Sequence, residues 1–498
     1  MELVIDLHLH SRFSRAVSPR MNLQNMYIWG RKKGLNVLSI ADFTYPLWFK
    51  ETRAQLEESQ EGIYRLKREK EVETEFNLPL RENDVGMHFM LSTEVACIYG
   101  GRVKDGQAGS YRIHCLILAP NYDVALKINK AFIARGFNLT ADGRPILGIS
   151  ARDLTEILFE IDRKIVLIPC HIWTPWFSLY GSKGGYDRIA DCFGEYSKYI
   201  FAVETGLSSD PSMNWRVNEL NSRSIVSFSD AHSLEKMGRE ATILKLKDGN
   251  STPEVGQAPL KSESLNSKQD SKSEIINRKS SIKQSDITYS NIMNALVKGK
   301  EKTFEIGYTI EFYPEEGKYH YTGHRNCNVI QTPDETKKNG AICPVCKREL
   351  TVGVMHRVDE LSNTEENNYE KETDAYGTVW LKDKKRIRPP YVNMVPLLEI
   401  LSEALHSGVS SQAVLGAYDN LISQFGSEHE ILLRSSLEKI KTLAGVTIAE
   451  GIGRVRERNI HINPGYDNTY GVVEIWGAAQ SVLSGGGKQE KEDQPGLF

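Results

Sequence analysis

The feature that most constrains this chain is a pair of histidines near its start, in the run Asp6-Leu7-His8-Leu9-His10-Ser11. Side chains two positions apart on a strand point to the same side, so both imidazoles can reach one metal ion. The apolar residues before the pair predict a buried strand that leads into it. A second run, Ser229-Asp230-Ala231-His232, follows another apolar stretch about 220 residues later. Ligands at the ends of strands so far apart in sequence are typical of a barrel, and they predict a metalloenzyme.

The composition narrows the class of protein. A chain of 498 residues with a net charge of -3 is long enough for about three domains, and it carries no global basic field. No stretch approaches the ~20 apolar residues of a membrane span, and no signal-peptide pattern precedes the first strand, so we expect no membrane partner. Four scattered cysteines in apolar surroundings indicate reduced core thiols: Cys97, Cys115, Cys170 and Cys192. We expect a cytoplasmic, nucleoid-associated protein.

Residues 1–247 alternate short β-branched runs with helical stretches, which predicts an α/β domain with parallel strands. The predicted strands include residues 37–40, 88–92, 113–119, 165–168, 201–204 and 225–228. The charged segment 51–75 is interpreted as one solvated helix.

The remaining chain divides by composition. Residues 248–286 are rich in Ser, Lys, Gln and Asn, which predicts a disordered insertion or linker. A cysteine-containing module is expected at 287–360, a polar and basic linker at 361–392, a helical domain at 393–478 and a flexible tail at 479–498.

A hydrolytic site with several ions needs imidazoles and bridging carboxylates. Nine candidates lie near predicted strand ends: His8, His10, Asp42, Glu94, His114, His171, Glu204, Asp230 and His232. A single histidine such as His114 is more often a hydrogen-bonded core residue. The whole set is difficult to attribute to packing, because buried carboxylates are costly without metal or basic partners. We expect two or three divalent ions (Zn²⁺, Mg²⁺ or Mn²⁺).

The histidine pair, with Glu94, His171 and the run Asp230-Ala231-His232, resembles the polymerase and histidinol phosphatase (PHP) superfamily over residues 1–247. The resemblance implies a distorted (β/α)7 barrel with up to three metal ions that hydrolyses phosphate esters. It also implies catalytic roles for Glu94, His171 and Asp230.

Longer runs resemble the endonuclease Q family, which is of PHP type. They are residues 10–16, 41–44, 142–148, 171–179, 229–233 and 238–242. The resemblance continues through the cysteine module and the C-terminal helices. It implies an endonuclease of base-damage repair that nicks DNA on the 5′ side of uracil, hypoxanthine, xanthine or an abasic site. This chain has Phe43 and Tyr45 where relatives have histidine, so one of three metal positions is expected to be altered.

The cysteine module carries its own metal signal. His324 and Cys327 form one pair with two intervening residues, and Cys343 and Cys346 form another. Two such pairs predict a tetrahedral structural Zn²⁺ with no open position. His320 is an alternative to His324 as the fourth ligand.

Several residues are candidates for DNA contact. Arg12 and Arg15 lie just beyond the histidine pair, and the run 382–388 is strongly basic, although a solvated loop is an equal interpretation. Aromatic side chains after His171 could stack on an extruded base or pack the barrel rim. The predicted DNA-binding residues are Arg12, Arg15, Trp173, Trp176, Lys183, Lys384, Lys385 and Arg386. Residues 437–457 weakly resemble a helix-hairpin-helix.

The last five residues, Gln494-Pro495-Gly496-Leu497-Phe498, end a polar tail. This pattern resembles the peptide that docks in the bacterial sliding clamp, with Gln494, Leu497 and Phe498 as its anchors. An exposed Leu-Phe pair at a flexible terminus otherwise has little structural purpose.

The leading hypothesis is therefore a metal-dependent endonuclease that acts on DNA with deaminated bases or abasic sites. A phosphoesterase for a small phosphorylated metabolite is the alternative that the barrel alone allows. A third hypothesis is a barrel without activity that serves as a scaffold on the sliding clamp.

Overall fold

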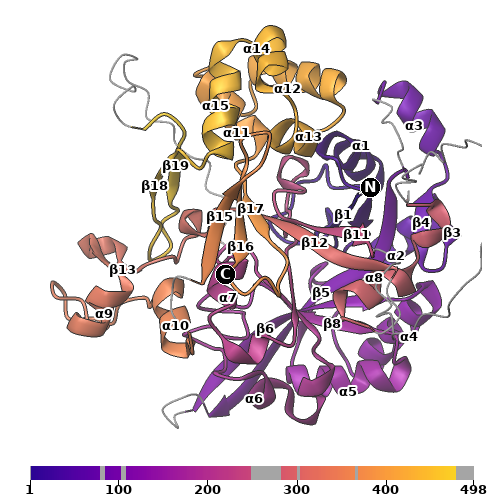
Figure 1. Cartoon of the computed structure of the whole chain (residues 1–498). Coiled ribbons are helices and arrows are strands. Elements are labelled where there is room, and N and C mark those ends of the chain that lie inside the picture. Colours follow the sequence, from indigo (N-terminus) through magenta and orange to yellow (C-terminus); the bar gives the residue numbers. More distant parts are fainter. Residues whose placement is uncertain are drawn as a thin grey trace, which may run out of the picture.

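The computed structural model describes residues 2–78, 85–102, 108–247, 282–299, 303–364 and 368–477 (Figure 1). In this part of the chain, seven strands form a barrel: β1 (Glu2–Asp6), β2 (Val37–Ser39), β5 (His88–Arg102), β6 (Ala108–Ala119), β8 (Val166–Pro169), β9 (Ala202–Glu204) and β10 (Ser224–Val226). β1, β2 and β5 pair in parallel, as do β9 and β10. β8 lies beside β9, and a parallel bridge between Leu9 and Ala231 closes the ring. The predicted α/β barrel is confirmed.

The expectation of parallel strands throughout is wrong at β6, which runs antiparallel to both β5 and β8. Only a few residues join β5 to β6, and a short connection can join only antiparallel neighbours. A second irregularity lies at β1, whose other edge pairs with β11 (Ala241–Leu246). Because β11 occupies that edge, β10 meets β1 only beyond the strand ends, and the barrel is distorted.

Six helices follow barrel strands or their loops: α1 (Leu23–Lys33), α2 (Pro46–Gln55), α4 (Tyr122–Ala134), α5 (Ala151–Ile161), α6 (Ile189–Phe193) and α7 (Pro211–Asn214). Their ends follow local rules. The side chain of Asn22 accepts a hydrogen bond from the backbone of Asn25 at the start of α1, and Gly34 ends that helix with a φ of 103°. Among the described residues, no helix is long and apolar enough to cross a membrane.

Side chains from all seven strands fill the barrel interior, including Ile5, Met90 and Ile168. Helix α8 (Tyr289–Leu296) packs into the same cluster, and its Tyr289 hydroxyl donates to the carbonyl oxygens of Leu118 and Lys164. Lys164 precedes β8, whereas His171 follows it, so α8 closes the end of the barrel opposite the predicted metal ligands. Ile282 and Ile287 are buried here, which limits the predicted disordered insertion; residues 248–281 lie outside the described chain.

The predicted helix at 51–75 is wrong. The segment contains the end of α2, a hairpin of β3 (Leu56–Gln60) and β4 (Ile63–Leu66), and the short helix α3 (Glu69–Glu75). Gly62 adopts a φ of 66° at the turn of the hairpin. The hairpin buries Leu56, Ile63 and Leu66, which a solvated helix would expose.

Two predicted boundaries also change. β12 (Phe304–Glu311) was assigned to the cysteine module but pairs with β11, so it extends the barrel sheet. The predicted linker 361–392 contains three more strands: β15 (Tyr369–Thr373), β16 (Val379–Asp383) and β17 (Tyr391–Asn393). β17 pairs in parallel with β12, and β15 and β16 continue the sheet. Their alternating polar residues match an exposed sheet margin, which composition alone presents as a linker.

The cysteine module contains β13 (Thr322–His324), β14 (Val329–Gln331), α9 (Pro333–Asn339) and α10 (Val354–Leu361), and it projects from one side of the barrel (Figure 1). The C-terminal helices are α11 (Leu397–Ala404), α12 (Gln412–Phe425), α13 (Glu428–Leu433), α14 (Leu437–Ala444) and α15 (Val446–Arg456), followed by the hairpin of β18 (His461–Asn463) and β19 (Val472–Glu474). They sit beside α1, where the buried Lys33 ammonium lies 2.7 Å from the Glu428 carboxylate.

Candidate metal centre

Two groups of potential metal ligands meet at the mouth of the barrel. The ligand atoms of His8, His10, Glu94 and Asp230 lie within 4.8 Å of one another, and so do those of Glu94, His114 and His171. Glu94 belongs to both groups. Its Oε2 lies 3.1 Å from His10 Nε2, and its Oε1 lies 2.6 Å from His114 Nδ1. A carboxylate that faces two groups through its two oxygens suits a bridge between two metal ions.

The donor atoms fit divalent cations. Three of them are buried and form no hydrogen bond in the described residues: His8 Nε2, His10 Nε2 and Asp230 Oδ1, the last two 3.1 Å apart. Buried polar atoms without partners are costly, so their concentration here needs a reason. Imidazole nitrogens with carboxylate oxygens are the donors that Zn²⁺ and Mn²⁺ accept, and a bound cation would satisfy most of these atoms.

The electrostatics agree with this fit. Burial opposes charge on Glu94, but His114 and Arg144 beside it hold its pKa well below its ordinary value. Burial also opposes charge on Asp230, yet the nearby His8 and His10 keep its pKa well below the ordinary value. Burial lowers the pKa of His114 to about 4, so its imidazole is neutral at pH 7, as a metal ligand must be.

Asp42 and Glu204, both predicted as ligands, lie behind the histidines. His10 Nδ1 lies 3.2 Å from Asp42 Oδ1, and His8 Nδ1 lies 2.8 Å from Glu204 Oε1. A carboxylate on the outer ring nitrogen fixes the orientation of a ligating imidazole. Asp42 belongs to neither ligand group of the described chain, and its position suits it to orient His10; its role as a ligand stays a prediction. Glu204 forms a smaller group with His8 and Cys170, but its oxygens already accept from His8 and from the backbone N–H of His171.

Asp42→Asn is expected to weaken binding of a divalent ion by about 10- to 100-fold, because His10 loses the charge that orients it. Titration with Mn²⁺, followed by electron paramagnetic resonance, measures this affinity. The matched control is Asp123→Asn, which changes an exposed residue in the first turn of α4. Equal affinities in the two variants would contradict the assigned role.

The remaining predicted ligands are also placed. His232 lies outside both groups; its ring centroid is 4.7 Å from that of His10, and its Nδ1 bonds the carbonyl oxygen of Asp230. Tyr45 stacks on Phe13 with ring centroids 4.6 Å apart, and buried Phe43 has no donor atom. Neither residue joins a ligand group in the described chain, which leaves the expectation of an altered third metal position untested.

Strained backbone aims the ligands. His171 and Asp230 adopt φ values of 30° and 45°, and Asp42 adopts 40°. Non-glycine residues in this region cost about 1–3 kcal/mol each, and such strain concentrates at functional sites. Each of the three residues lies within four positions of the end of a barrel strand (β2, β8 or β10), so the left-handed turns occur where the chain passes the ligands His171 and Asp230 and their neighbour Asp42.

Sequence reasoning missed two charged residues of the site. Arg144 Nη1 lies 3.1 Å from Glu94 Oε2, and its side chain is 14% exposed. Gly143 lets the loop before Arg144 pack against Asp42, since a Cβ there would lie 2.6 Å from Asp42 Oδ2. Asp6 is fully buried and accepts hydrogen bonds from Ser229 and from the backbone of Gly238, which ties β1 to the loop that carries Asp230. The signal for Arg144 was present in the run 142–148.

A second layer of carboxylates lies beneath the site. Burial raises the pKa of Glu311 to about 8 despite hydrogen bonds from Thr309, Ser227 and Thr205. Burial and the neighbouring Glu311 also raise the pKa of Glu240 well above its ordinary value. Glu311 is therefore largely protonated at neutral pH, while the unfolded chain ionises it near 4.5.

This difference predicts how stability depends on pH. A carboxyl with a raised folded-state pKa favours the folded state most below its unfolded pKa, and that contribution is lost as pH rises toward 8. Glu311→Gln mimics the protonated form at every pH. The free energy of unfolding of the variant, relative to that of the natural chain, should therefore increase by about 2–4 kcal/mol when the pH is raised from 5 to 9. Urea unfolding at both pH values measures the gain. A difference that does not change with pH would refute the buried protonated state.

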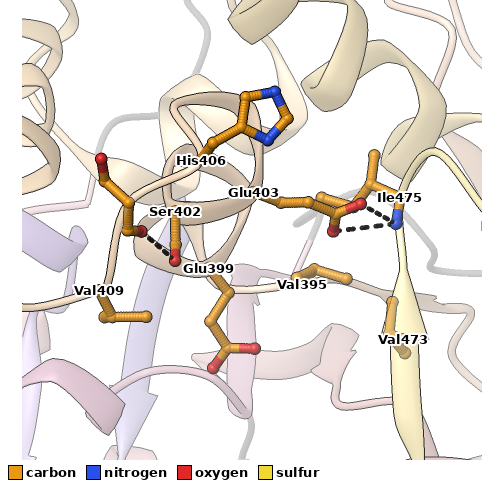
Figure 2. A pocket seen from close by; sticks show the side chains of 9 residues that line it. Val395, Glu399, Ser402, Glu403, His406, Val409, Val473 and Ile475 are labelled. Carbon is orange, nitrogen blue, oxygen red and sulfur yellow. Dashed lines mark hydrogen bonds between the residues drawn. The ribbon is translucent and has the colours of Figure 1, made fainter. Parts of the chain in front are cut away.

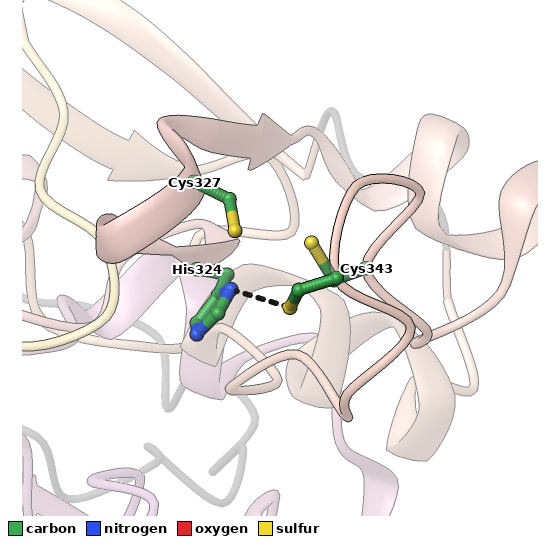
Figure 3. Close-up of side chains that lie close together, drawn as sticks. His324, Cys327 and Cys343 are labelled. Carbon is green, nitrogen blue, oxygen red and sulfur yellow. Dashed lines mark hydrogen bonds between the residues drawn. The ribbon is translucent and has the colours of Figure 1, made fainter.

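The cysteine module brings its four predicted ligands together (Figure 3). The donor atoms of His324, Cys327, Cys343 and Cys346 lie within 4.8 Å of one another. Burial opposes ionisation of Cys343, but backbone N–H groups of Cys346 and Val345 lower its pKa to about 6. His320 is buried, and its Nδ1 lies 3.1 Å from the carbonyl oxygen of Pro314, so His324 is the imidazole of this group. Four convergent S and N donors fit a structural Zn²⁺.

The predicted DNA contacts separate into three places. Arg12 and Arg15 are exposed near the barrel mouth, although Arg12 is paired with Glu51. Lys183 pairs with Glu349 of the cysteine module, and Trp176 packs edge-to-face on Tyr319. Lys384, Lys385 and Arg386 lie in the exposed loop before β17, and the adjacent Arg388 contacts Asn221 before β10, at the opposite end of that strand from Asp230.

Trp173 does not fit its predicted role. It is 1% exposed, and its indole N–H donates to Asn214 over 2.8 Å. Its ring also packs on Tyr180, with centroids 4.9 Å apart. Such a side chain offers no face to an extruded base, so the prediction of base contact is wrong for Trp173.

A separate cavity of about 300 Å³ lies between α11 and β19 (Figure 2). Its carboxylate Glu403 accepts hydrogen bonds from the backbone N–H groups of Ile475 and Trp476, and Ser402 donates to the carbonyl of Ser407. These polar groups are already satisfied, and they join the β18–β19 hairpin to the helices.

Comparisons with known proteins agree with this architecture. Residues 396–459 match the MJ0043 C-terminal domain family. The MJ0043 protein of Methanocaldococcus jannaschii is 28% identical over 305 residues, which are 61% of this chain but only 31% of that protein. The YqxK protein of Bacillus subtilis (strain 168) is 26% identical over 74% of this chain and 75% of its own length.

Solved structures match nearly the whole chain. The lesion-specific endonuclease PfuEndoQ from Pyrococcus furiosus superposes with a TM-score of 0.70 and 26% identity, and the match covers 97% of this chain and 98% of that one. An endonuclease Q complex with a 27-mer duplex substrate that has an abasic lesion at the active site gives the same score and identity, over 97% and 100% of the two chains. In sequence and in fold, the chain is therefore similar to endonuclease Q over nearly its whole length.

Proposed function

We propose that this protein is a metal-dependent DNA endonuclease of base-damage repair. Glu94 carries the argument, because one buried carboxylate faces two groups of ligands at the open end of a barrel. The similarity to a lesion-specific endonuclease over 97% of the chain supports DNA as the substrate. The reaction would be a nick on the 5′ side of a deaminated base (uracil, hypoxanthine or xanthine) or of an abasic site.

The proposed role of each residue follows from its position in the site. His8, His10, Glu94 and Asp230 would hold one ion, and His114 and His171 would hold a second with Glu94. When bound, the ions supply an acidified water and neutralise charge on the phosphate. Asp42 and Glu204 keep the ligating imidazoles in place through their outer nitrogens. In the first of these groups, Asp230 is the most exposed ligand, with 15% of its side chain accessible, so it is the one that a substrate would reach most easily.

Arg144 is the further residue that we assign to the reaction. Only one of its guanidinium nitrogens is hydrogen-bonded in the described chain, to Glu94, so the others are available to a phosphate oxygen. Arg144→Gln is expected to weaken binding of lesion DNA about tenfold and to slow nicking by about 10²-fold, since it removes one positive charge beside the phosphate. Fluorescence anisotropy with Ca²⁺, together with single-turnover cleavage, separates the two effects. The conservative variant Arg144→Lys should recover part of each.

The proposed function is tested with labelled duplexes that carry one uracil, one hypoxanthine or one abasic site, beside an undamaged duplex. A nick immediately 5′ of the lesion that requires Mg²⁺ or Mn²⁺ is the expected result. Cleavage of the undamaged duplex at the same rate as the damaged ones would show that the nuclease is not specific for lesions. If no duplex is cut while small phosphomonoesters are hydrolysed, the barrel acts on a metabolite instead.

Selectivity for damaged bases and recruitment to a sliding clamp are supported by different observations. A damaged base stacks or pairs less well than a normal base, so it costs less to extrude from the duplex. The tail with Gln494, Leu497 and Phe498 lies outside the described residues; its sequence supports docking to a sliding clamp. A peptide of the last 15 residues should bind the clamp, and Phe498→Ala should abolish that binding.

A further inference from the structure

A second cavity, of about 570 Å³, lies far from the metal ligands along the barrel strands. It is bordered by the start of β10, the end of α8, strand β12 and the loop before β17. Ser224 begins β10, whereas Asp230 follows the end of that strand, so the cavity and the metal centre lie toward opposite ends of the barrel. Its volume is in the range of small-molecule sites. We call it the basic cavity.

Positive charge dominates its lining. Arg223, Lys298, Arg386 and Arg388 line the basic cavity with a single acid, Glu305. Arg223 is held by the carbonyl oxygens of Ile200, Glu219 and Ser197, and it forms no ion pair with a carboxylate in the described chain. Carbonyl oxygens orient a guanidinium without cancelling its charge. Arg386 pairs with Glu370 and Glu372, and Arg388 pairs with Asp383, so Arg223 is the guanidinium whose charge is most available to a ligand.

The geometry of the charged groups is fixed in advance. Arg388 bonds Asp383 and Asn221, and its guanidinium lies over the Trp215 ring at 5.7 Å from the centroid. Such restraint lowers the entropy that a ligand must remove when it binds. Planar guanidinium groups in fixed positions suit phosphate oxygens better than flexible ammonium groups do.

Ser224 provides an independent sign of a ligand. The residue is 2% exposed and lines the cavity, and its Oγ has no hydrogen-bond partner in the described chain. A buried hydroxyl without a partner is unfavourable unless something else completes it. A ligand oxygen in the cavity would do so.

Part of the lining of the cavity is apolar, and we call this part the apolar wall. It includes Pro211, Leu220, Ile225, Ile306 and Pro390. A free inorganic phosphate would use the cations but leave this wall empty. A ligand with both a phosphate and a flat apolar part, of the size of a mononucleotide, would use both.

We propose that the basic cavity binds a nucleoside monophosphate unit, either as a free nucleotide or as one unit of a DNA strand. Its phosphate would face Arg223, Lys298 and the Ser224 hydroxyl, and its base would lie on the apolar wall. This site is distinct from the metal centre and does not depend on the proposed nuclease activity.

Isothermal titration of the full chain without added Mg²⁺ or Mn²⁺ tests the proposal, with deoxyadenosine monophosphate, deoxyadenosine and inorganic phosphate as probes. The monophosphate should bind at least tenfold more tightly than either of the other two. Lys298→Gln should weaken it about threefold to tenfold, and Glu305→Gln, the matched control of opposite sign, should strengthen it by a similar factor. Ser224→Ala should weaken binding while the unfolding midpoint in urea is unchanged or higher, because no internal hydrogen bond is lost.

A (dT)12 oligonucleotide distinguishes the two sources. If it displaces the monophosphate and its own binding responds to Lys298→Gln, the natural ligand is a DNA strand; failure to compete points to a free nucleotide. The proposal is overturned if the monophosphate does not bind, or if its affinity is the same in Lys298→Gln and Glu305→Gln as in the natural chain. Lesion nicking by the Lys298 and Glu305 variants, measured in parallel, reports on the metal centre independently.

Discussion

Asp230→Ala is expected to reduce metal-dependent nicking by at least about 10³-fold while the chain remains folded. Asp230 is the ligand that joins the last barrel strand to the histidine pair, since its Oδ1 lies 3.1 Å from His10 Nε2 and 3.7 Å from His8 Nε2. Removing it deletes one ligand and also the negative charge that attracts the cation. Single-turnover cleavage of an abasic duplex measures the loss.

Stability gives this variant a distinctive signature. Without a bound metal, Asp230 still lies within ion-pair distance of His8 and His10, and Ala tolerates the left-handed φ of 45° less well than Asp does. Unfolding in urea with a chelator present should therefore show a loss of about 1–3 kcal/mol, with the folded state retained. Asp419→Asn, on the surface of α12, is the control and should nick normally. Full activity in Asp230→Ala would exclude the assigned metal centre.

Cys343→Ser is expected to release one Zn²⁺ per chain and to unfold the cysteine module. The module has little core of its own, since β13 and β14 pair over three residues each, so the metal supplies much of its stability. Structural zinc sites of this type are worth about 10–16 kcal/mol in isolated peptides near pH 7. Mass spectrometry under native conditions measures the zinc, and limited proteolysis should cut within residues 322–350 of the variant only.

The two histidines of the module provide the matched comparison. His324→Ala should lose the zinc, whereas His320→Gln should keep it, because His320 bonds the carbonyl of Pro314 and stands apart from the thiolates. Zinc loss from His320→Gln with retention in His324→Ala would reverse the ligand assignment. The barrel should remain folded in all three variants, since the cluster that fills its interior contains no residue of the module; α10 shares only the outer cluster, through Val354 and Val358.

The barrel and most of its ligands could be predicted because their signals are local. An apolar run of three to five residues followed by His or Asp marks a strand end, and β1, β8 and β10 follow that pattern. The cysteine pairs are similar, since a turn of four residues is sufficient to place two thiolates or a thiolate and an imidazole on one ion. Neither inference needed knowledge of the rest of the chain.

Elements that depend on distant partners could not be predicted. β15 and β16 are polar strands, and they appear as a linker until β17 pairs with β12, about 80 residues earlier in sequence. The charged hairpin β3–β4 likewise forms because β4 pairs with β5. Strand propensity is weak without a neighbouring strand, so composition alone favoured a linker and a helix.

By itself, the sequence determined which residues can bind metal, because the identity of a donor atom and the two-residue period of a strand are properties of short segments. Only the tertiary structure decided which of those donors face an ion. It placed Asp42 behind His10, brought Arg144 to Glu94 and buried Trp173, and it carried the basic loop before β17 away from the metal centre. The reason is that ligation depends on direction as well as proximity, and direction is set by how the barrel closes.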